Sequence, residues 1–182
     1  MDVLDALRTR RTVGAFAPEL PPFEAVERAI EAATWAPNHH LTEPWRFHVF
    51  TGAGRAELAA AAGTTLPPDR DTDEERAAIR AKFERAPVLV VVTQAGGDGD
   101  AVRDLEDYAA CACATQNLLL AAHAQGLAAK WSTGKLARSE GVRQRLGLAE
   151  DDRIVAFVYL GYAAADAAAA PRRSPPQITR YG

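Results

Sequence analysis

Sulfur is scarce in this sequence, which has two cysteines and one methionine among its 182 residues. Cys111 and Cys113 are too few for a disulfide scaffold, so we expect reduced thiols and a cytoplasmic protein. No apolar run approaches the roughly 20 residues that span a bilayer, and the acidic start, Met1 to Asp5, lacks the basic region of a signal peptide. The sequence therefore predicts no membrane partner.

A large charge of one sign is also missing, because the formal net charge is -3. Bulk charge of this size gives no reason to expect nucleic acid as a partner. Any anionic ligand must therefore be bound by a local group of basic side chains.

The motifs of several common enzyme classes are absent. Gly96, Gly97 and Gly99 follow an apolar run, but they fit neither G-x-G-x-x-G nor a P-loop, which would need a lysine. No Gly-x-Ser-x-Gly elbow surrounds Ser132, so it is not expected to be a nucleophile. The sequence thus predicts no catalytic side chain, and it argues against a classical dinucleotide or P-loop fold.

Apolar periodicity predicts helices and strands in alternation. The expected helices cover residues 3–9, 23–33, 55–62, 74–83, 105–125 and 142–146, and the expected strands cover 45–51, 88–92, 128–132 and 154–160. The run at 88–92 should be buried on both faces of a sheet. The helix at 105–125 is apolar nearly all round, which suits the centre of a structure or a subunit interface. We expect one α+β domain over residues 1–182.

Arg10, Arg11 and Thr12 follow the first predicted helix, and two interpretations of them stay open. Cations at a helix C-terminus are common, because they favour the negative end of the helix dipole. Two guanidinium groups and a hydroxyl also supply the donors that a phosphate needs.

The loop of residues 38–44 contains the adjacent histidines His39 and His40. Neighbouring side chains on an extended segment point apart, so the pair is expected to chelate poorly. His48 and His123 are isolated in the sequence, and no zinc-like spacing appears. We therefore predict no metal site.

Trp131, Ser132, Thr133 and Gly134 follow a predicted strand directly. A turn of this kind exposes hydroxyls and a backbone amide, which suit a polar heterocycle edge or a phosphate. It could equally be an ordinary strand-ending turn. Arg172 and Arg173 are a second arginine pair, either solvated or a further anion clamp.

Five segments in order along the chain resemble the nitroreductase family, and its small members especially. They are residues 10–12, residues 36–47 (APNHHLTEPWRF), the long Ala-rich helix ending at 125–127, residues 131–134 (WSTG) and residues 155–162 (VAFVYLGY). The resemblance implies a three-layer α/β/α sandwich with a mixed, largely antiparallel central sheet. It also implies an intertwined homodimer with FMN at the subunit interface. Residues 163–182 would form a C-terminal extension that packs on the partner subunit.

Carried over residue by residue, the resemblance implies an FMN site. Arg10 and Thr12 would hold the phosphate and ribityl chain, with Arg11 a neighbouring contact. A loop from the partner subunit would reach the flavin, and the WSTG turn would lie beside the ring. The members of these two groups are Pro37, Asn38 and His39 in the loop, and Trp131, Ser132 and Thr133 in the turn. Arg172 or Arg173 would add phosphate contacts.

Three positions depart from the family pattern. Gly14 stands where relatives often have Lys or Arg, so one phosphate cation is missing. Leu41 and Glu43 replace the usual Asn and Gln. A carboxylate beside the reduced flavin would disfavour its anion, so Glu43 either points elsewhere or lowers the flavin potential.

The resemblance implies an oxidoreductase in which FMN carries the chemistry and NAD(P)H is the electron donor. A small-molecule electron acceptor, such as a nitroaromatic compound or a quinone, would then take the donor's place in a ping-pong scheme. Two alternatives stay open. One is a flavoenzyme of the same fold with another reaction, namely dehalogenation, enoate reduction or flavin fragmentation. The other is a flavin-binding protein without turnover.

Overall fold

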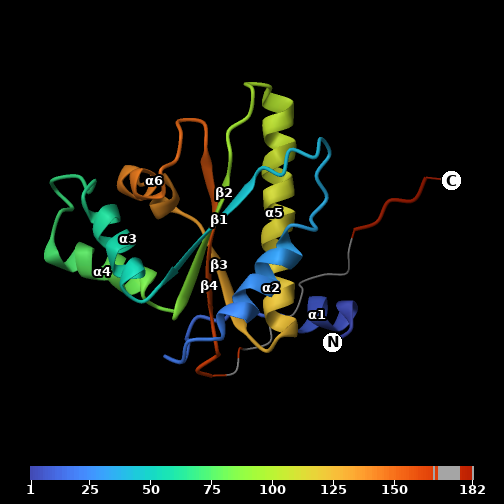
Figure 1. Cartoon of the computed structure of the whole chain (residues 1–182), viewed down its shortest axis with the longest axis horizontal. Coiled ribbons are helices and arrows are strands. Elements are labelled where there is room, and N and C mark those ends of the chain that lie inside the picture. Colours follow the sequence, from blue (N-terminus) through green and yellow to red (C-terminus); the bar gives the residue numbers. More distant parts are fainter. Residues whose placement is uncertain (166, 168–176, 182) are drawn as a thin grey trace.

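The computed structural model describes residues 1–165, 167 and 177–181, and a four-stranded sheet lies at its centre. The strands are β1 (Trp45–Thr51), β2 (Val88–Gln94), β3 (Ala128–Ser132) and β4 (Arg153–Gly161), arranged in the order β1-β2-β4-β3 (Figure 1). Every neighbouring pair among these strands is antiparallel. The parallel component of the expected mixed sheet is confined, among described residues, to a single bridge between Thr12 and Ala129.

The two central strands carry the most apolar sequence of the chain. All seven residues of β2 are buried, and β4 is buried at every position after Arg153. Both strands have a neighbour on each side and helices on each face, which is the environment that continuous valine-rich runs favour. The prediction that residues 88–92 are buried on both faces is confirmed.

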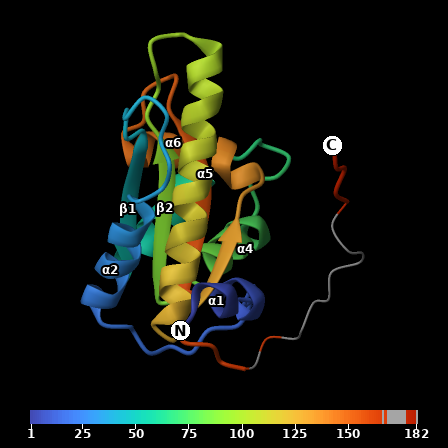
Figure 2. The ribbon, with the colours of Figure 1, turned by 90° about the vertical axis from the view of Figure 1, so that its right-hand side faces the viewer.

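One face of the sheet is covered by α2 (Phe23–Ala33) and α5 (Ala101–Ala124), and α1 (Val3–Thr9) lies against the C-terminal end of α5 (Figure 2). The contact between α2 and α5 is built on alanine, because small side chains let two helix backbones approach closely. The buried alanines are Ala25, Ala29 and Ala33 of α2 and Ala110, Ala114 and Ala122 of α5.

The opposite face carries α3 (Ala53–Gly63), α4 (Asp73–Phe83), α6 (Glu140–Leu146) and the short 3-10 helix η1 (Lys135–Arg138) (Figure 1). Its core centres on Phe83 and Phe157, whose rings meet edge to face with centroids 5.6 Å apart. Gly141 of α6 lies directly against the backbone of Ala61 in α3. Helices on both faces confirm the expected three-layer α/β/α arrangement.

Most element boundaries agree with the predictions to within two residues, and two differences are larger. α5 begins at Ala101 rather than at residue 105, because Asp100 caps it by accepting hydrogen bonds from the backbone N–H of Val102 and Arg103. The 3-10 helix η1 was not predicted, since its four residues are too short for a periodicity to appear.

Apolar side chains remain exposed on the face that carries α1 and α5. They form an outward stripe along α5 and cover much of α1, while two more lie in the described C-terminal segment. These residues are Val102, Leu105 and Tyr108 of α5, Val3, Leu4 and Leu7 of α1, and Ile178 and Tyr181 near the C-terminus. Exposure reaches 80% at Ile178 and 92% at Tyr181. We define the outward residues of α5 between Val102 and Cys113 as the α5 stripe. In the described part of the chain, no helix has the length and apolar character needed to cross a membrane.

Candidate functional site

The segment that follows α1 runs beside the edge strand β3. The backbone N–H of Val13 donates to the carbonyl of Ala129 at 3.1 Å, and Thr12 forms a parallel bridge with the same residue. Two of the predicted motifs, residues 10–12 and the turn after β3, therefore sit on neighbouring backbone segments. About four residues separate Ala129 from Thr133, which is roughly 13 Å along a strand.

Arg10 and Arg11 line a cavity of about 460 Å³ at the start of β3, which we call the Arg10 cavity. His123 of α5 also lines it, with Nε2 2.8 Å from the hydroxyl oxygen of Thr9. Burial lowers the pKa of His123, and the positive charges of Arg10 and Arg11 lower it further. The described lining of this cavity includes two arginines and no carboxylate, so the cavity suits an anion.

The two arginines have different surroundings. Nη1 of Arg11 donates to the carbonyls of Arg8 and Arg10, at 2.6 and 2.9 Å. This guanidinium therefore binds carbonyl oxygens at the C-terminal end of α1, as the helix-punctuation interpretation predicts. Arg10 follows the last helical residue, and its backbone N–H closes the helix by donating to Ala6. Both arginines line the cavity, and the family resemblance predicts that Arg10 holds the ligand phosphate.

Further along β3, a second cavity of about 340 Å³ is basic and lies on the α4 side of the sheet. We call it the Lys130 cavity. Ser132 and Thr133, both predicted site residues, line it together with Tyr159. Four cations also line it: Lys82, Arg85, Lys130 and Lys135. No carboxylate is among the residues that line it.

The cations of the Lys130 cavity affect one another. Burial lowers the pKa of Lys130, and the charge of Arg85 lowers it further. The guanidinium carbon of Arg85 lies 5.3 Å from the centre of the Tyr159 ring, a cation–π contact. Cations held together against their mutual repulsion are suited to an anionic ligand. Sequence reasoning missed these residues, although Lys130 stands two positions before Ser132 and so faces the same side of the strand.

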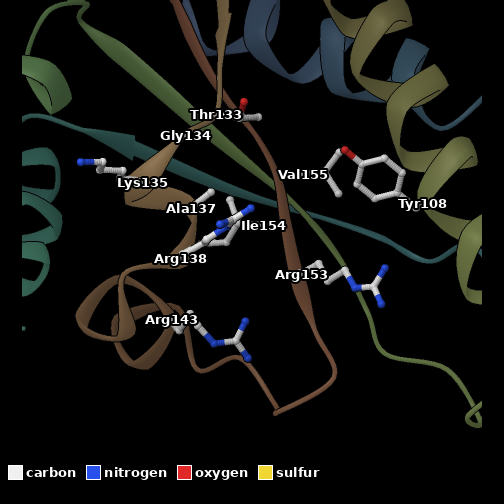
Figure 3. Close-up of a pocket in the computed structure, with 10 residues that line it drawn as sticks. All are labelled: Tyr108, Thr133, Gly134, Lys135, Ala137, Arg138, Arg143, Arg153, Ile154 and Val155. Atoms are coloured by element: carbon white, nitrogen blue, oxygen red, sulfur yellow. The ribbon is translucent and has the colours of Figure 1, made fainter.

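The strand ends in a third cavity of about 750 Å³, which we call the Tyr108 cavity (Figure 3). Thr133 and Gly134 line its entry from β3, and Tyr108 lines it from α5. Trp131 points to the opposite face from Lys130, against the core cluster that includes α2 and α5. The three cavities follow one another along β3, and the predicted turn residues lie between the second and the third.

The loop at residues 38–43 is folded by its own polar side chains. Asn38 Oδ1 accepts from the backbone N–H of Glu43 at 2.8 Å, and its Nδ2 donates to the hydroxyl of Thr42 at 3.1 Å. Thr42 in turn donates to the buried carboxylate of Asp107 on α5, at 2.6 Å. These contacts hold Leu41 and Glu43 at positive φ, an uncommon conformation for residues other than glycine. Asn38 therefore shapes the loop, and Glu43 is held exposed within it.

The expectation that His39 and His40 point apart is wrong. Nδ1 of His39 and Nε2 of His40 each lie 3.2 Å from the same carboxylate oxygen of Glu106, and the ring centroids are 4.2 Å apart. The loop turns at this point instead of running extended, so both rings meet α5. The three ligand atoms lie within 4.8 Å of one another, close enough to share a cation. All three side chains are well exposed to solvent, and ordinary histidine–carboxylate hydrogen bonds account for the contacts.

Within one chain the loop and the Arg10 cavity lie far apart. The loop contacts Glu106 in the first half of α5, whereas the Arg10 cavity is lined by Leu119 and His123 in the second half. The helical rise puts about 25 Å between Glu106 and His123. Pro37, which precedes Asn38, is placed with the loop. Arg172 and Arg173 lie outside the described residues.

Comparisons with known proteins give consistent matches. Residues 7–162 match the model of the nitroreductase family. YdjA of Escherichia coli, provisionally named an NAD(P)H nitroreductase, is 34% identical over 168 residues, which is 88% of this chain and 88% of YdjA. A solved nitroreductase-like protein of Bacillus cereus superposes with a TM-score of 0.84 at 30% identity, over 96% of this chain and 92% of that one. A provisionally named nitroreductase of Desulfovibrio desulfuricans, solved in complex with FMN, has a TM-score of 0.74 at 24% identity, over 97% and 98% of the two chains.

Proposed function

The chain belongs to the nitroreductase family, and from this premise we propose that it is an FMN-dependent oxidoreductase. When bound, FMN supplies hydride transfer from NAD(P)H to a small-molecule electron acceptor, such as a nitroaromatic compound or a quinone. The structural neighbour from Desulfovibrio desulfuricans binds FMN. The residues of this chain would bind the cofactor, orient it and shield it from water.

The Arg10 cavity suits the phosphate end of the cofactor. Arg10 and His123 both line it. Because the cavity lies at the start of β3, the ribityl chain and the ring would extend from it along the rest of that strand. Guanidinium groups bind phosphate through paired, charge-assisted hydrogen bonds. Thr12 lies on the adjacent bridge to Ala129, where its hydroxyl can contribute to the ribityl chain.

The Lys130 cavity suits the polar edge of the flavin ring. The pyrimidine part of a reduced flavin carries negative charge, and groups preorganised around developing charge stabilise it. Lys130, Arg85 and Lys82 provide positive charge without a carboxylate lining the same space. Thr133 and Gly134 add backbone N–H groups at the end of β3, where they can orient the ring. The proposed reaction requires no side chain of this set as a nucleophile.

We propose a homodimer in which each site is completed by the second copy. The α5 stripe and the exposed apolar residues of α1 supply a surface for self-association. The loop with Pro37, Asn38 and His39 lies too far along α5 to reach the Arg10 cavity of its own chain, so it would serve the site of the partner. The C-terminal segment with exposed Ile178 and Tyr181 would pack on the partner as well.

One observation carries the proposal: the arginine-lined Arg10 cavity and the predicted turn at Ser132 and Thr133 lie along the same strand, β3. FMN needs such a separation, because its phosphate and its ring lie at opposite ends of one chain. Replacing Arg10 tests the placement of the phosphate. Arg10→Ala should weaken FMN binding at least tenfold, or about 1.4 kcal/mol, as measured by quenching of flavin fluorescence.

Two controls make this test specific. Riboflavin lacks the phosphate, so its affinity should be the same in wild type and Arg10→Ala. Arg8→Ala removes an exposed arginine of α1 that does not line the cavity, and should leave FMN affinity unchanged. An Arg10→Ala protein that binds FMN as tightly as wild type would show that the phosphate lies elsewhere.

The activity is tested by anaerobic stopped-flow reduction of the FMN-loaded protein, with NADH and NADPH in separate runs. We expect reduction much faster than that of free FMN, followed by reoxidation on adding a nitroaromatic compound or a quinone. Rapid reduction without reoxidation by either acceptor would favour another reaction of the same fold. Reduction no faster than free FMN would favour a flavin-binding protein without turnover.

A further inference from the structure

The Tyr108 cavity has features that the binding of FMN does not use. Its apolar lining includes two consecutive residues of β4 that face opposite sides of the strand: Ile154 lies on the side of Arg138, and Val155 lies with Tyr108 on the side of α5 (Figure 3). Four cations from η1, α6 and β4 also line it. These cations are Lys135, Arg138, Arg143 and Arg153, and no aspartate or glutamate is among the lining residues.

The four cations are not equivalent. Arg143 is fully engaged by backbone carbonyls, donating to Asp152 at 2.8 Å and to Ala149 at 2.6 Å. Nη2 of Arg153 lies 2.5 Å from Oδ2 of Asp104, so the charge of Arg153 is balanced. Lys135 also lines the Lys130 cavity, and Figure 3 shows its amine pointing away from the three arginines.

Arg138 is the cation that remains available. Within residues 1–165, 167 and 177–181, its guanidinium has neither a hydrogen-bond partner nor an ion-pair partner. Arg138 is the last residue of η1, which directly follows Thr133 and Gly134, and all three residues line the Tyr108 cavity. Arg138 therefore lies beside the proposed position of the flavin ring. In a cavity, charge is focused by the surrounding protein, and Arg143, on the same side of β4, adds to the positive potential around Arg138.

We propose that the Tyr108 cavity binds an anionic group of the molecule that exchanges electrons with the flavin, and that Arg138 is the residue that selects for it. This inference rests on the proposed function, because the cavity gains its role from the flavin beside it. The ligand class is an aromatic or heterocyclic molecule with a phosphate or carboxylate. Ile154 contacts its ring, and Arg138, which lies on the same side of β4, binds the oxyanion through paired hydrogen bonds.

Two molecules in the proposed reaction could supply the oxyanion. One is the electron donor, since NADPH differs from NADH by a 2′-phosphate. The other is an electron acceptor that carries a carboxylate. Arg138 would bind the oxyanion of either molecule in the same way. Binding experiments with each kind of ligand distinguish the two sources, and they need no turnover because the FMN-loaded protein stays oxidised.

The experiment measures dissociation constants by titration calorimetry for two matched ligand pairs. NADP⁺ and NAD⁺ differ only by the 2′-phosphate, and benzoate and benzamide differ by the carboxylate charge. Wild type should bind the anionic member of one pair or of both pairs more tightly. Arg138→Gln should weaken that ligand about tenfold, equivalent to about 1.4 kcal/mol, and leave its neutral or less charged counterpart unchanged.

Arg145→Gln is the matched control, because Arg145 lies on nearby α6 but pairs with Glu57 at 2.8 Å and does not line the cavity. This variant removes the same charge and should bind all four ligands as wild type does. An effect of Arg138→Gln on NADP⁺ alone identifies the donor as the source, and an effect on benzoate alone identifies the acceptor. Either result supports the proposal.

The proposal is overturned if wild type fails to discriminate within both pairs. It is also overturned if Arg138→Gln leaves the discrimination unchanged, or weakens both members of a pair equally. The proposed function is judged separately, by FMN binding to wild type and to Arg138→Gln before the titrations. A protein that loads FMN normally and reacts with NAD(P)H, yet shows no dependence on Arg138, refutes the subsite and leaves the proposed function standing.

Discussion

The two faces of the sheet are covered in different ways. On the side of α3, α4 and α6, the outer surface is polar and carries ion pairs, such as Arg80 with Glu84 and Arg145 with Glu57. On the side of α1, α2 and α5, apolar residues of α1 and of the α5 stripe face outward. Both faces bury a continuous core against the sheet. Among the described residues, the helices of the first face expose no large apolar side chain, whereas α1 and α5 on the second face expose several, as surfaces for association do.

This difference separates two kinds of damage that a substitution can cause. A change on the α3–α6 side should reduce the stability of the fold, because its contacts are all within the chain. A change on the α5 stripe should leave the fold intact and disrupt assembly, and with it the sites that we propose to lie between two copies. The same chemical change placed on the two faces should therefore have different consequences.

The largest effect is expected from Ala109→Arg, an exposed position of the α5 stripe. A charge there would be buried without a partner in the proposed dimer, which is costly. We expect a monomer by sedimentation or light scattering, and FMN affinity lower by about a hundredfold, or about 2.7 kcal/mol.

Ala78→Arg makes the same substitution at an exposed position of α4 on the opposite face. It should change neither the oligomeric state nor FMN affinity. A dimer that survives Ala109→Arg, or dissociates equally in both variants, would remove the distinction between the faces.

A glycine on the α3–α6 side is expected to be the next most sensitive position. An added Cβ at Gly141 would lie 1.8 Å from the carbonyl oxygen of Ala61, so α6 and α3 must separate. Overpacking against backbone costs about 3 kcal/mol, which urea unfolding of Gly141→Ala should show. Gly14→Ala is the control, since a Cβ there meets nothing within 4 Å. Equal stability of the two variants would contradict the close packing of α6.

The alkylation rates of the two cysteines test whether a second copy of the chain covers the α5 stripe. Burial raises the pKa of Cys111 to about 12, so its thiol should resist alkylation, whereas Cys113 is exposed on the single chain. If the α5 stripe is covered by a second copy, Cys113 should react slowly in wild type and several-fold faster in Ala109→Arg. Iodoacetamide labelling followed by mass spectrometry measures both rates. Cys113 that reacts at the same rate in both proteins would argue against an interface at this stripe.

The smallest effect concerns pH. Burial lowers the pKa of His48, which faces the hydroxyl of Thr93, although the charge of Asp152 opposes the shift. The unfolded chain therefore binds more protons below the ordinary histidine pKa of about 6.5. The stability contribution is fully present above that pH and is lost as pH falls through the lowered pKa.

Urea unfolding across this range should show that stability falls with acid, and His48→Gln should reduce the slope. His123 has a pKa shifted in the same direction, so part of the slope will remain. An unchanged slope in His48→Gln would mean that His48 does not contribute to the acid sensitivity.

The sequence predicted most of the fold because its patterns are local. Strong apolar runs located all four strands, and apolar periodicity located most helix ends within a few residues. The start of α5 was missed, because Leu105 looked like the first periodic residue while Asp100 supplies the cap. The pairing of His39 and His40 on Glu106 was missed because it depends on a loop that turns back onto a distant helix.

The candidate site was predicted only where its residues fall in short motifs. Residues 10–12 and 131–133 were recognised by order and spacing, and β3 brings them together. Lys82 and Arg85 were not predicted, because they come from the end of α4 and the segment after it and meet Ser132 only through the tertiary fold. Arg138 was missed for the same reason, since η1 has no sequence signature of its own.

The distance along α5 between Glu106 and His123 has a genetic consequence. If each site combines the Arg10 cavity of one chain with the loop of the other, two defective chains can restore one another. A mixed dimer of an Arg10→Ala chain and a chain with a defective loop would hold one site with both lesions and one with neither. Co-expression of two inactive alleles should then recover up to half the sites of each mixed dimer, a form of complementation that a protein with self-contained sites cannot show.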